Sequence, residues 1–237
     1  MIPKLIHQTW KTKDAPARWK PFIDKVQYLN PDWKYQLWSD DENDAFVKSE
    51  YPEFYEVFTG FSRGIMRADV IRYLIMYKLG GVYLDLDYEV LKPFDFGNNK
   101  VVLPLNRSIA YGDPVNGLGN CFFASEPGHK FWENVITDLQ NNPPRITDYV
   151  DVIEATGPLL LTRIFNENKC DDIYLPERLI YHPPTPTNKR DENKIKNNGV
   201  SLGIHHPWGS WKERWSIAYI MKKLRKILKI QTSRDRQ

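Results

Sequence analysis

Apolar and polar positions near the start of the chain predict two short strands with a helix between them. Residues 3–10 and residues 34–38 are short, partly alternating apolar runs, as expected for strands. Residues 19–29 fit a helix that is stopped by an Asn-Pro pair. Ser39 is followed three residues later by Glu42, which is the pattern of a capping box, so another helix should begin there.

The clearest periodicity in the chain predicts a helix followed directly by a strand. Apolar residues recur at helical spacing from residue 64 to residue 78, and Gly80 and Gly81 provide a stop. Residues 82–90 then alternate with period two, which predicts a single strand. Strands alternating with helices indicate an α/β fold with a mainly parallel sheet, helices on both faces, and ligands bound beyond the carboxyl ends of the strands.

The second half of the chain has a less regular pattern. Glycine, proline and asparagine clusters after Lys92 indicate loops. Residues 127–140 and a segment beginning near residue 158 are predicted to be helical, whereas residues 183–198 read as a polar, proline-rich loop.

Composition is typical of a folded protein and excludes several classes. The chain has 237 residues, of which 41% are hydrophobic and 14% aromatic, enough for one domain with its own core and unlike a disordered protein. No apolar run is long enough to span a bilayer, and the N-terminus lacks the pattern of a signal peptide. Cys121 and Cys170 match no short metal-binding spacing, so free thiols are expected, although the sequence leaves a single disulfide open.

Asp85 and Asp87 are the central chemical feature of the sequence. Side chains two residues apart on a strand lie on the same face, about 7 Å apart along it, so the pair could hold a divalent cation. Mg²⁺ and Mn²⁺ prefer oxygen ligands and are often shared with substrate phosphates. The pair therefore suits a nucleotide diphosphate bound through a metal.

The predicted helix before this strand carries Asp69 and Arg72, which are three residues apart and hence neighbours on the helix surface. One interpretation is a structural ion pair within the helix. The other is a binding role, in which Asp69 accepts hydrogen bonds from sugar hydroxyls and Arg72 donates to oxygens of the sugar or diphosphate.

Four motifs in this order resemble the family 32 glycosyltransferases that contain a DXD motif. They are Ile-Pro-Lys-x-Ile-His-Gln-x-Trp at residues 2–10, Arg-Ala-Asp-x-x-Arg-Tyr at 67–73, Gly-Gly-Val-Tyr-x-Asp-x-Asp at 80–87, and His-His-Pro-Trp-Gly-Ser-Trp at 205–211. The resemblance is clearest from residue 2 to about residue 95, and Thr-Gly-Pro at residues 156–158 and the His-His to Ser-Trp segment are later anchors. That family includes fungal mannosyltransferases and bacterial transferases for capsules and lipopolysaccharides.

The resemblance implies a GT-A fold, a Rossmann-like sheet with a single nucleotide-sugar site, with retaining stereochemistry and Mn²⁺, or else Mg²⁺, as cofactor. It also implies site residues. Asp85 and Asp87 resemble the motif that binds metal and diphosphate. Arg72 is expected to stabilise the departing nucleoside diphosphate. The predicted donor-binding residues are His7, Gln8, Trp10, Asp69, Arg72, Tyr83, Ser210 and Trp211.

A histidine pair near the end of the chain is expected to complete the metal site. His205 and His206 are predicted to lie on a loop, and in this fold class a residue of a C-terminal loop often joins the metal shell. Imidazole is a suitable Mn²⁺ ligand beside carboxylates. The spacing to Trp211 favours His206 as the metal ligand, and the Trp211 indole N–H could bond a phosphate.

The sequence thus predicts a retaining hexosyltransferase that uses a UDP- or GDP-sugar and acts on a glycan or lipid-linked acceptor, with a role in making surface polysaccharides. Two alternatives remain: a metal-dependent nucleotidyl or phosphoryl transferase, and a carbohydrate-binding module without activity. A P-loop motif is missing from the sequence, which disfavours one form of the first alternative. No nucleic-acid partner is expected.

Residues 212–237 are predicted to form a tail separate from a GT-A domain at residues 1–211. This tail has nine Lys or Arg against two Asp or Glu, although the whole chain carries a net charge of only +3. Its apolar residues recur at helical spacing, so we expect a basic amphipathic helix. Such a helix predicts a cytoplasmic protein attached to the inner face of an anionic membrane. The alternative is an ordinary terminal helix that packs on the domain and exposes its basic face to solvent.

Overall fold

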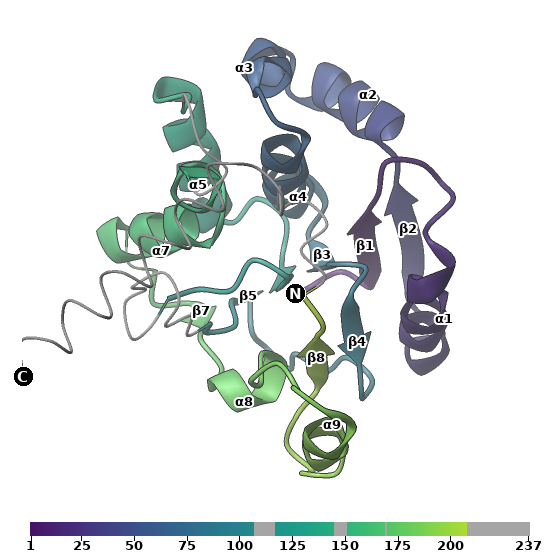
Figure 1. Cartoon of the computed structure of the whole chain (residues 1–237). Coiled ribbons are helices and arrows are strands. Elements are labelled where there is room, and N and C mark those ends of the chain that lie inside the picture. Colours follow the sequence, from purple (N-terminus) through teal and green to yellow (C-terminus); the bar gives the residue numbers. More distant parts are fainter. Residues whose placement is uncertain (107–116, 145–150, 169, 208–237) are drawn as a thin grey trace, which may run out of the picture.

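The computed structural model describes residues 1–106, 117–144, 151–168 and 170–207. In this part of the chain a central sheet has six strands in the order β2-β1-β3-β6-β5-β7, and β4 and β8 form a separate two-stranded sheet (Figure 1). The strands are β1 (Leu5–Thr9), β2 (Lys34–Trp38), β3 (Gly81–Leu84), β4 (Tyr88–Val90), β5 (Val101–Val102), β6 (Phe122–Ser125), β7 (Ile173–Tyr174) and β8 (Gly203–His205).

Helices cover the sheet and connect its strands. The α-helices are α1 (Lys20–Leu29), α2 (Asp40–Glu50), α3 (Tyr55–Gly60), α4 (Gly64–Leu79), α5 (Lys130–Asn141), α6 (Asp151–Ala155), α7 (Pro158–Glu167), α8 (Arg178–Tyr181) and α9 (Lys189–Lys196). Short 3-10 helices at Ala17–Trp19 and Pro52–Phe54 precede α1 and α3.

The central sheet is mainly parallel, as the sequence predicts. β1 pairs in parallel with both β2 and β3, and β5 pairs in parallel with β7, whereas β6 runs antiparallel to its neighbours β3 and β5. The parallel order β2-β1-β3 brings the carboxyl ends of β1 and β3 side by side. The residues that follow these two strands therefore meet at one edge of the sheet.

Two hydrophobic clusters lie on opposite faces of the sheet, because successive strand residues point to opposite sides. Tyr83 belongs to the cluster beneath α4, α5 and α7, whereas Val82 and Leu84 belong to the cluster beside α1. All residues of α4 from Asp69 to Met76 are buried, so it is a core helix and not an amphipathic surface helix.

Most elements predicted from periodicity are confirmed. The two N-terminal strands, the helix between them and the helix from residue 64 form as expected. Ser39 accepts a hydrogen bond from the Glu42 amide, and the Glu42 carboxylate accepts one from the Ser39 amide, so the capping box is present. Cys121 and Cys170 are free thiols.

Two expectations are wrong in detail. The predicted strand over residues 82–90 is two strands, β3 and β4, joined by a tight turn in which the Tyr88 amide donates to the Asp85 carbonyl at 3.0 Å. The break occurs because β4 leaves the central sheet and pairs with β8 instead. The predicted loop over residues 183–198 contains α9, which is capped by Asn188 and has no buried residue, so its apolar signal is weak.

The glycine pair between α4 and β3 is required by geometry. Gly80 and Gly81 have φ angles of +63° and +95°, which side chains rarely adopt. A Cβ atom on Gly81 would also lie 2.6 Å from the carbonyl oxygen of Leu5 in the neighbouring strand. These glycines therefore let the chain turn sharply into the centre of the sheet.

We expect Gly81→Ala to lower the free energy of unfolding by on the order of 3 kcal/mol, from backbone strain together with the clash against β1. Gly97→Ala is the matched control, since Gly97 also has a positive φ angle, +53°, but no atom within 4 Å of the added Cβ. Urea denaturation should show a loss of about 1 kcal/mol for the control. Equal losses for the two variants would contradict the close approach of β1.

No helix in the described stretches is long and apolar enough to cross a membrane.

Candidate active site

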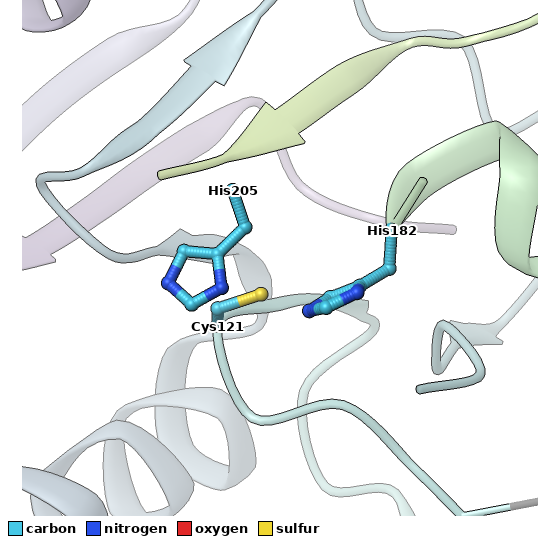
Figure 2. A group of neighbouring side chains, drawn as sticks. All are labelled: Cys121, His182 and His205. Carbon is cyan, nitrogen blue, oxygen red and sulfur yellow. The ribbon is translucent and has the colours of Figure 1, made fainter. Parts of the chain in front are cut away.

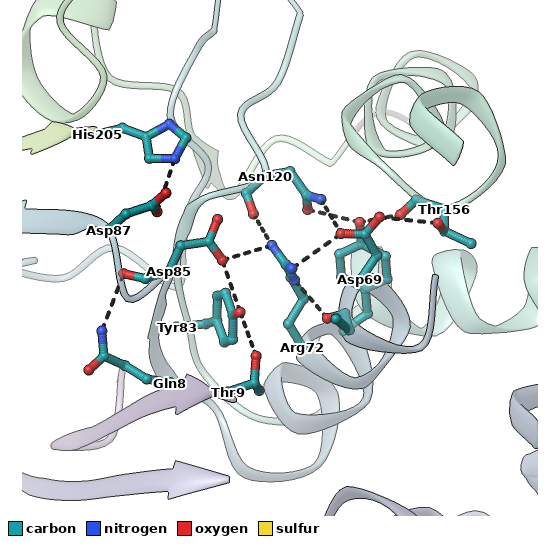
Figure 3. Close-up of polar contacts among 12 residues, drawn as sticks. Gln8, Thr9, Asp69, Arg72, Tyr83, Asp85, Asp87, Asn120, Thr156 and His205 are labelled. Atoms are coloured by element: carbon teal, nitrogen blue, oxygen red, sulfur yellow. Dashed lines mark hydrogen bonds and ion pairs between the residues drawn. The ribbon is translucent and has the colours of Figure 1, made fainter. Parts of the chain in front are cut away.

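Asp85 and Asp87 lie in the turn between β3 and β4, at the carboxyl end of a central strand (Figure 3). The turn is fixed through its backbone. The Asp85 amide donates to the Cys121 carbonyl at 2.9 Å, and the Gln8 side-chain amide donates to the Asp85 carbonyl at 3.2 Å. The two carboxylates remain partly exposed, with 28% and 16% of their side-chain surfaces accessible. They are therefore held in place but still open to a ligand.

Arg72 of α4 lies between Asp69 and Asp85, as Figure 3 shows. Its Nη1 is 3.1 Å from the Asp85 carboxylate, and its Nη2 is 3.2 Å from the Asp69 carboxylate. The guanidinium also donates to the carbonyls of Ala68 and Asn120. Only 5% of its side chain is exposed, so the positively charged guanidinium contacts Asp85 from the protein interior.

Asp69 is buried and bound by three partners. Its carboxylate accepts hydrogen bonds from the Asn120 amide at 2.9 Å and the Thr156 hydroxyl at 3.1 Å, in addition to its contact with Arg72. Burial raises the pKa of both Asp69 and Asp85, and Arg72 counteracts this shift by favouring their charged forms. The structure thus shows the ion pair of the first interpretation and places it next to Asp85, whereas the role in binding sugar or diphosphate remains a prediction.

Tyr83 supports Asp85 from inside the sheet. Its hydroxyl donates to the same Asp85 oxygen that Arg72 contacts, at 3.0 Å, and lies 3.1 Å from the Thr9 hydroxyl. The Arg72 guanidinium lies over the Tyr83 ring, 4.8 Å from its centroid. The tyrosine is 1% exposed, so it contacts the Asp85 carboxylate from the interior and is not open to a ligand in solvent.

The structure brings His205, and not His206, to the carboxylate pair. His205 Nε2 is 3.3 Å from the Asp87 carboxylate, whereas His206 Nε2 is 3.2 Å from Glu89. His205 ends β8 and His206 is the next residue, so His205 lies on a strand and not on the expected loop, and the two side chains point in opposite directions. The His206 ring stacks on Phe22 of α1, at 5.2 Å between centroids. The geometry therefore favours His205 over His206 as the candidate metal ligand.

The donor set fits a divalent metal ion. Asp85, Asp87 and His205 each offer a ligand atom, and these atoms lie within 4.8 Å of one another. Two carboxylate oxygens and one imidazole suit Mn²⁺. Burial alone would lower the pKa of His205, but Cys121 and Asp87 raise it above its usual value, so a metal ion that binds this imidazole has to displace a proton.

The residues predicted on the first strand have different surroundings. His7 is 2% exposed, with one ring nitrogen near the Gly80 carbonyl and the other accepting from the Trp38 indole. Burial lowers its pKa to about 4, so it is neutral. Gln8 is also buried and orients the Asp85 backbone. Trp10 packs edge-on against Trp19. Of the three, the structure connects only Gln8 to the carboxylate turn.

Two polar residues of the site have no clear signal in the sequence. Asn120 and Thr156 hold Asp69 from segments 51 and 87 residues away in sequence. Asn120 lies in a segment that reads as a loop, and Thr156 precedes α7 next to a glycine and a proline. Both residues lie among residues typical of turns, and a role in a turn would explain each of them equally well. Only the fold brings them together at Asp69.

Ser210, Trp211 and the basic tail at residues 212–237 lie outside the described residues. The expectations for them remain predictions from the sequence.

Comparison with known proteins connects this site to a family. A family model described as the glycosyltransferase sugar-binding region containing the DXD motif matches residues 16–106. Mannosyl phosphorylinositol ceramide synthase CSH1 of Saccharomyces cerevisiae is 35% identical over 170 residues, covering 71% of this chain and 44% of the relative. Inositol phosphoceramide mannosyltransferase 2 of Schizosaccharomyces pombe is also 35% identical over 170 residues, covering 71% and 48%. The chain spans about half the length of the curated relatives it matches.

Solved structures show the same fold at low sequence identity. The glycosyltransferase domain of the YGT toxin has a TM-score of 0.54 at 9% identity, covering 74% of this chain and 80% of that one. Mouse xyloside xylosyltransferase 1 has a TM-score of 0.50 at 12% identity, covering 86% and 97%. The GT-A fold implied by the resemblance is therefore confirmed. With its Asp-x-Asp pair at the carboxyl end of a central strand, the chain contains a segment, residues 16–106, that matches the sugar-binding region with a DXD motif found in these glycosyltransferases.

Proposed function

We propose that this chain is a divalent-metal-dependent hexosyltransferase that moves mannose from a nucleoside diphosphate sugar to a lipid-linked acceptor. The observation that carries this proposal is the convergence of Asp85, Asp87 and His205 above the buried Arg72. The relatives named for mannosyl transfer to inositol phosphoceramide support both the sugar and the lipid acceptor.

In this proposal Asp85, Asp87 and His205 hold Mn²⁺ or Mg²⁺. The ion would supply positive charge that stabilises the departing nucleoside diphosphate. The surrounding residues hold the metal-binding side chains in position. Arg72 and Tyr83 both bind one oxygen of Asp85, which leaves the other oxygen of that carboxylate for the site. The permanent charge of Arg72 also adds to the positive potential under the leaving group.

Asp69 and Arg72 act in this proposal mainly as positioning residues. Asp69 already accepts from Asn120, Thr156 and Arg72, so a direct contact with a sugar hydroxyl could use only its remaining acceptor capacity. We therefore assign Asp69 to orienting Arg72, and Arg72 to orienting Asp85. Retaining stereochemistry and attachment to the cytoplasmic face of a membrane remain predictions from the sequence.

The proposal is tested by incubating the protein with Mn²⁺ and separate GDP-mannose, UDP-glucose, UDP-galactose and CMP-sugar donors. We expect slow release of nucleoside diphosphate from GDP-mannose, and faster release when an inositol-phosphate-containing sphingolipid is added. Pyrophosphate release would instead support a nucleotidyl transferase. Glycan binding without donor turnover would support a binding module and overturn the proposal.

The shift of the metal ligand to His205 gives a separate prediction. His205→Ala should weaken Mn²⁺ binding by at least about tenfold, since it removes a direct ligand. His206→Ala is the matched neighbour and should change the Mn²⁺ dissociation constant by less than about twofold, because its ring faces Glu89. Isothermal titration with Mn²⁺ measures both, and the reverse order would restore the expectation from the sequence.

A further inference from the structure

A second group of potential metal ligands lies next to the carboxylate pair, and two of its three residues, Cys121 and His182, have no part in the proposed transfer reaction. Cys121, His182 and His205 surround a common point, as Figure 2 shows, and one ligand atom of each lies within 4.8 Å of the other two. Two of the three residues, Cys121 and His182, contact neither Asp85 nor Asp87 through their side chains in any described hydrogen bond.

Each of the three residues is placed by regular structure. Cys121 precedes β6, and its carbonyl accepts from the Asp85 amide. His182 follows α8, with its amide donating to the Arg178 carbonyl at 2.8 Å. His205 ends β8 and pairs with Tyr88 of β4. The cysteine and His182 are 4% and 7% exposed, so the cluster is a preformed and nearly closed site.

The chemistry of this cluster differs from that of the carboxylate pair. A thiolate with two imidazoles is a soft to borderline ligand set, which suits Zn²⁺, whereas Mg²⁺ and Mn²⁺ prefer oxygen. Three protein ligands also leave the fourth tetrahedral position for water or another small ligand. We propose that Cys121, His182 and His205 form a second metal site that binds Zn²⁺.

The two histidines are arranged so that a metal ion could engage them with little rearrangement. His182 Nδ1 is one of two buried side-chain polar atoms without a hydrogen-bond partner in the described part of the chain. An ion that binds this nitrogen would therefore displace no hydrogen bond from it. The His205 ring presents one nitrogen to Asp87 and the other to Cys121 (Figures 2 and 3).

This shared imidazole couples the two sites. A neutral imidazole has one nitrogen free to bind a metal, because the other carries its proton. Zn²⁺ on the cysteine side would therefore withdraw His205 from an ion held by Asp85 and Asp87. That consequence rests on the proposed function, whereas the zinc site itself does not.

Cobalt binding tests the zinc site without any activity assay. Metal-free protein, kept reduced and anaerobic, is titrated with Co²⁺, whose bond to a thiolate gives a charge-transfer absorption in the near ultraviolet. We expect this band to saturate at one Co²⁺ per chain and to disappear when Zn²⁺ is added. Absence of the band in the wild-type protein would overturn the proposal.

Variants separate this site from the carboxylate pair and from the other thiol. Cys121→Ser should lose the band, whereas Cys170→Ser, which alters the cysteine outside the cluster, should keep it. His182→Gln should keep a thiolate band but weaken Co²⁺ binding by at least about tenfold. Circular dichroism confirms that each variant is folded. A band that survives in folded Cys121→Ser, or unchanged affinity in His182→Gln, would contradict the site.

A final comparison tests the sharing of His205. Asp87→Asn should keep the cobalt band, since its carboxylate is not part of the cluster, even though it should lose Mn²⁺ binding. In wild-type protein, one equivalent of Zn²⁺ should weaken Mn²⁺ binding by at least about tenfold, as loss of one direct ligand would. Equal Mn²⁺ affinity with and without Zn²⁺ would contradict the sharing. If Mn²⁺ fails to bind at all, the proposed function fails while the cobalt result still decides the zinc site.

Discussion

Asp85→Asn and Asp87→Asn are each expected to lower the rate of transfer by on the order of 100-fold or more, with the fold retained. An amide keeps the size of the carboxylate but loses the negative charge that holds a divalent ion. Both side chains are partly exposed, so the loss should appear in turnover far more than in stability. Donor turnover at saturating Mn²⁺ measures the effect, and melting temperature checks the fold.

The matched control is Asp95→Asn, which alters a carboxylate in the exposed turn that its side chain forms with the Gly97 amide. Its rate should stay within about twofold of wild type, as for a surface substitution away from the site. Wild-type rates in both Asp85→Asn and Asp87→Asn would remove the metal pair from the account.

Arg72→Lys is the second substitution with a large expected effect. Lysine keeps the positive charge but cannot reach Asp69, Asp85 and two carbonyls at once, as the guanidinium does. We expect turnover to fall by at least about tenfold because Asp85 loses its orientation. The free energy of unfolding should fall by about 1–3 kcal/mol, as buried hydrogen bonds to charged groups are left unmade.

Arg163→Lys is the control for this change. Arg163 also makes a two-pronged contact with a carboxylate, that of Asp138, but it lies on the surface with 44% of its side chain exposed. Its replacement should cost less than about 1 kcal/mol and leave turnover unchanged. Comparable losses of stability for Arg72→Lys and Arg163→Lys would show that burial adds nothing to the Arg72 network.

The elements that dominate the fold were predictable because their local signals agree with their final surroundings. The capping box at Ser39, the apolar run of α4 and the glycine pair after it all specify structure within a few residues. The break between β3 and β4 could not be predicted, because the alternation over residues 82–90 is continuous and only pairing with distant β8 redirects the chain.

The candidate site was predictable where the sequence itself places residues on one strand or helix. Asp85, Asp87, Asp69 and Arg72 satisfy that condition and lie together in the structure. The choice between His205 and His206 depends on which face of β8 turns toward Asp87, and strand register decides this. Asn120 and Thr156 reach the site from remote loops, and although Thr156 belongs to an anchor of the resemblance, no local pattern showed that either residue contacts Asp69.

The central claim is that Asp85, Asp87 and His205 bind a divalent ion together with the donor's diphosphate. The most direct test is the Mn²⁺ affinity of the wild-type protein, measured with and without GDP, and compared with guanosine. Because coupling between two ligands is reciprocal, GDP should tighten Mn²⁺ binding, whereas guanosine, which lacks phosphate, should not. Asp87→Asn should abolish the tightening. A Mn²⁺ affinity that is the same with and without GDP, or that is unchanged in Asp87→Asn, would contradict the account.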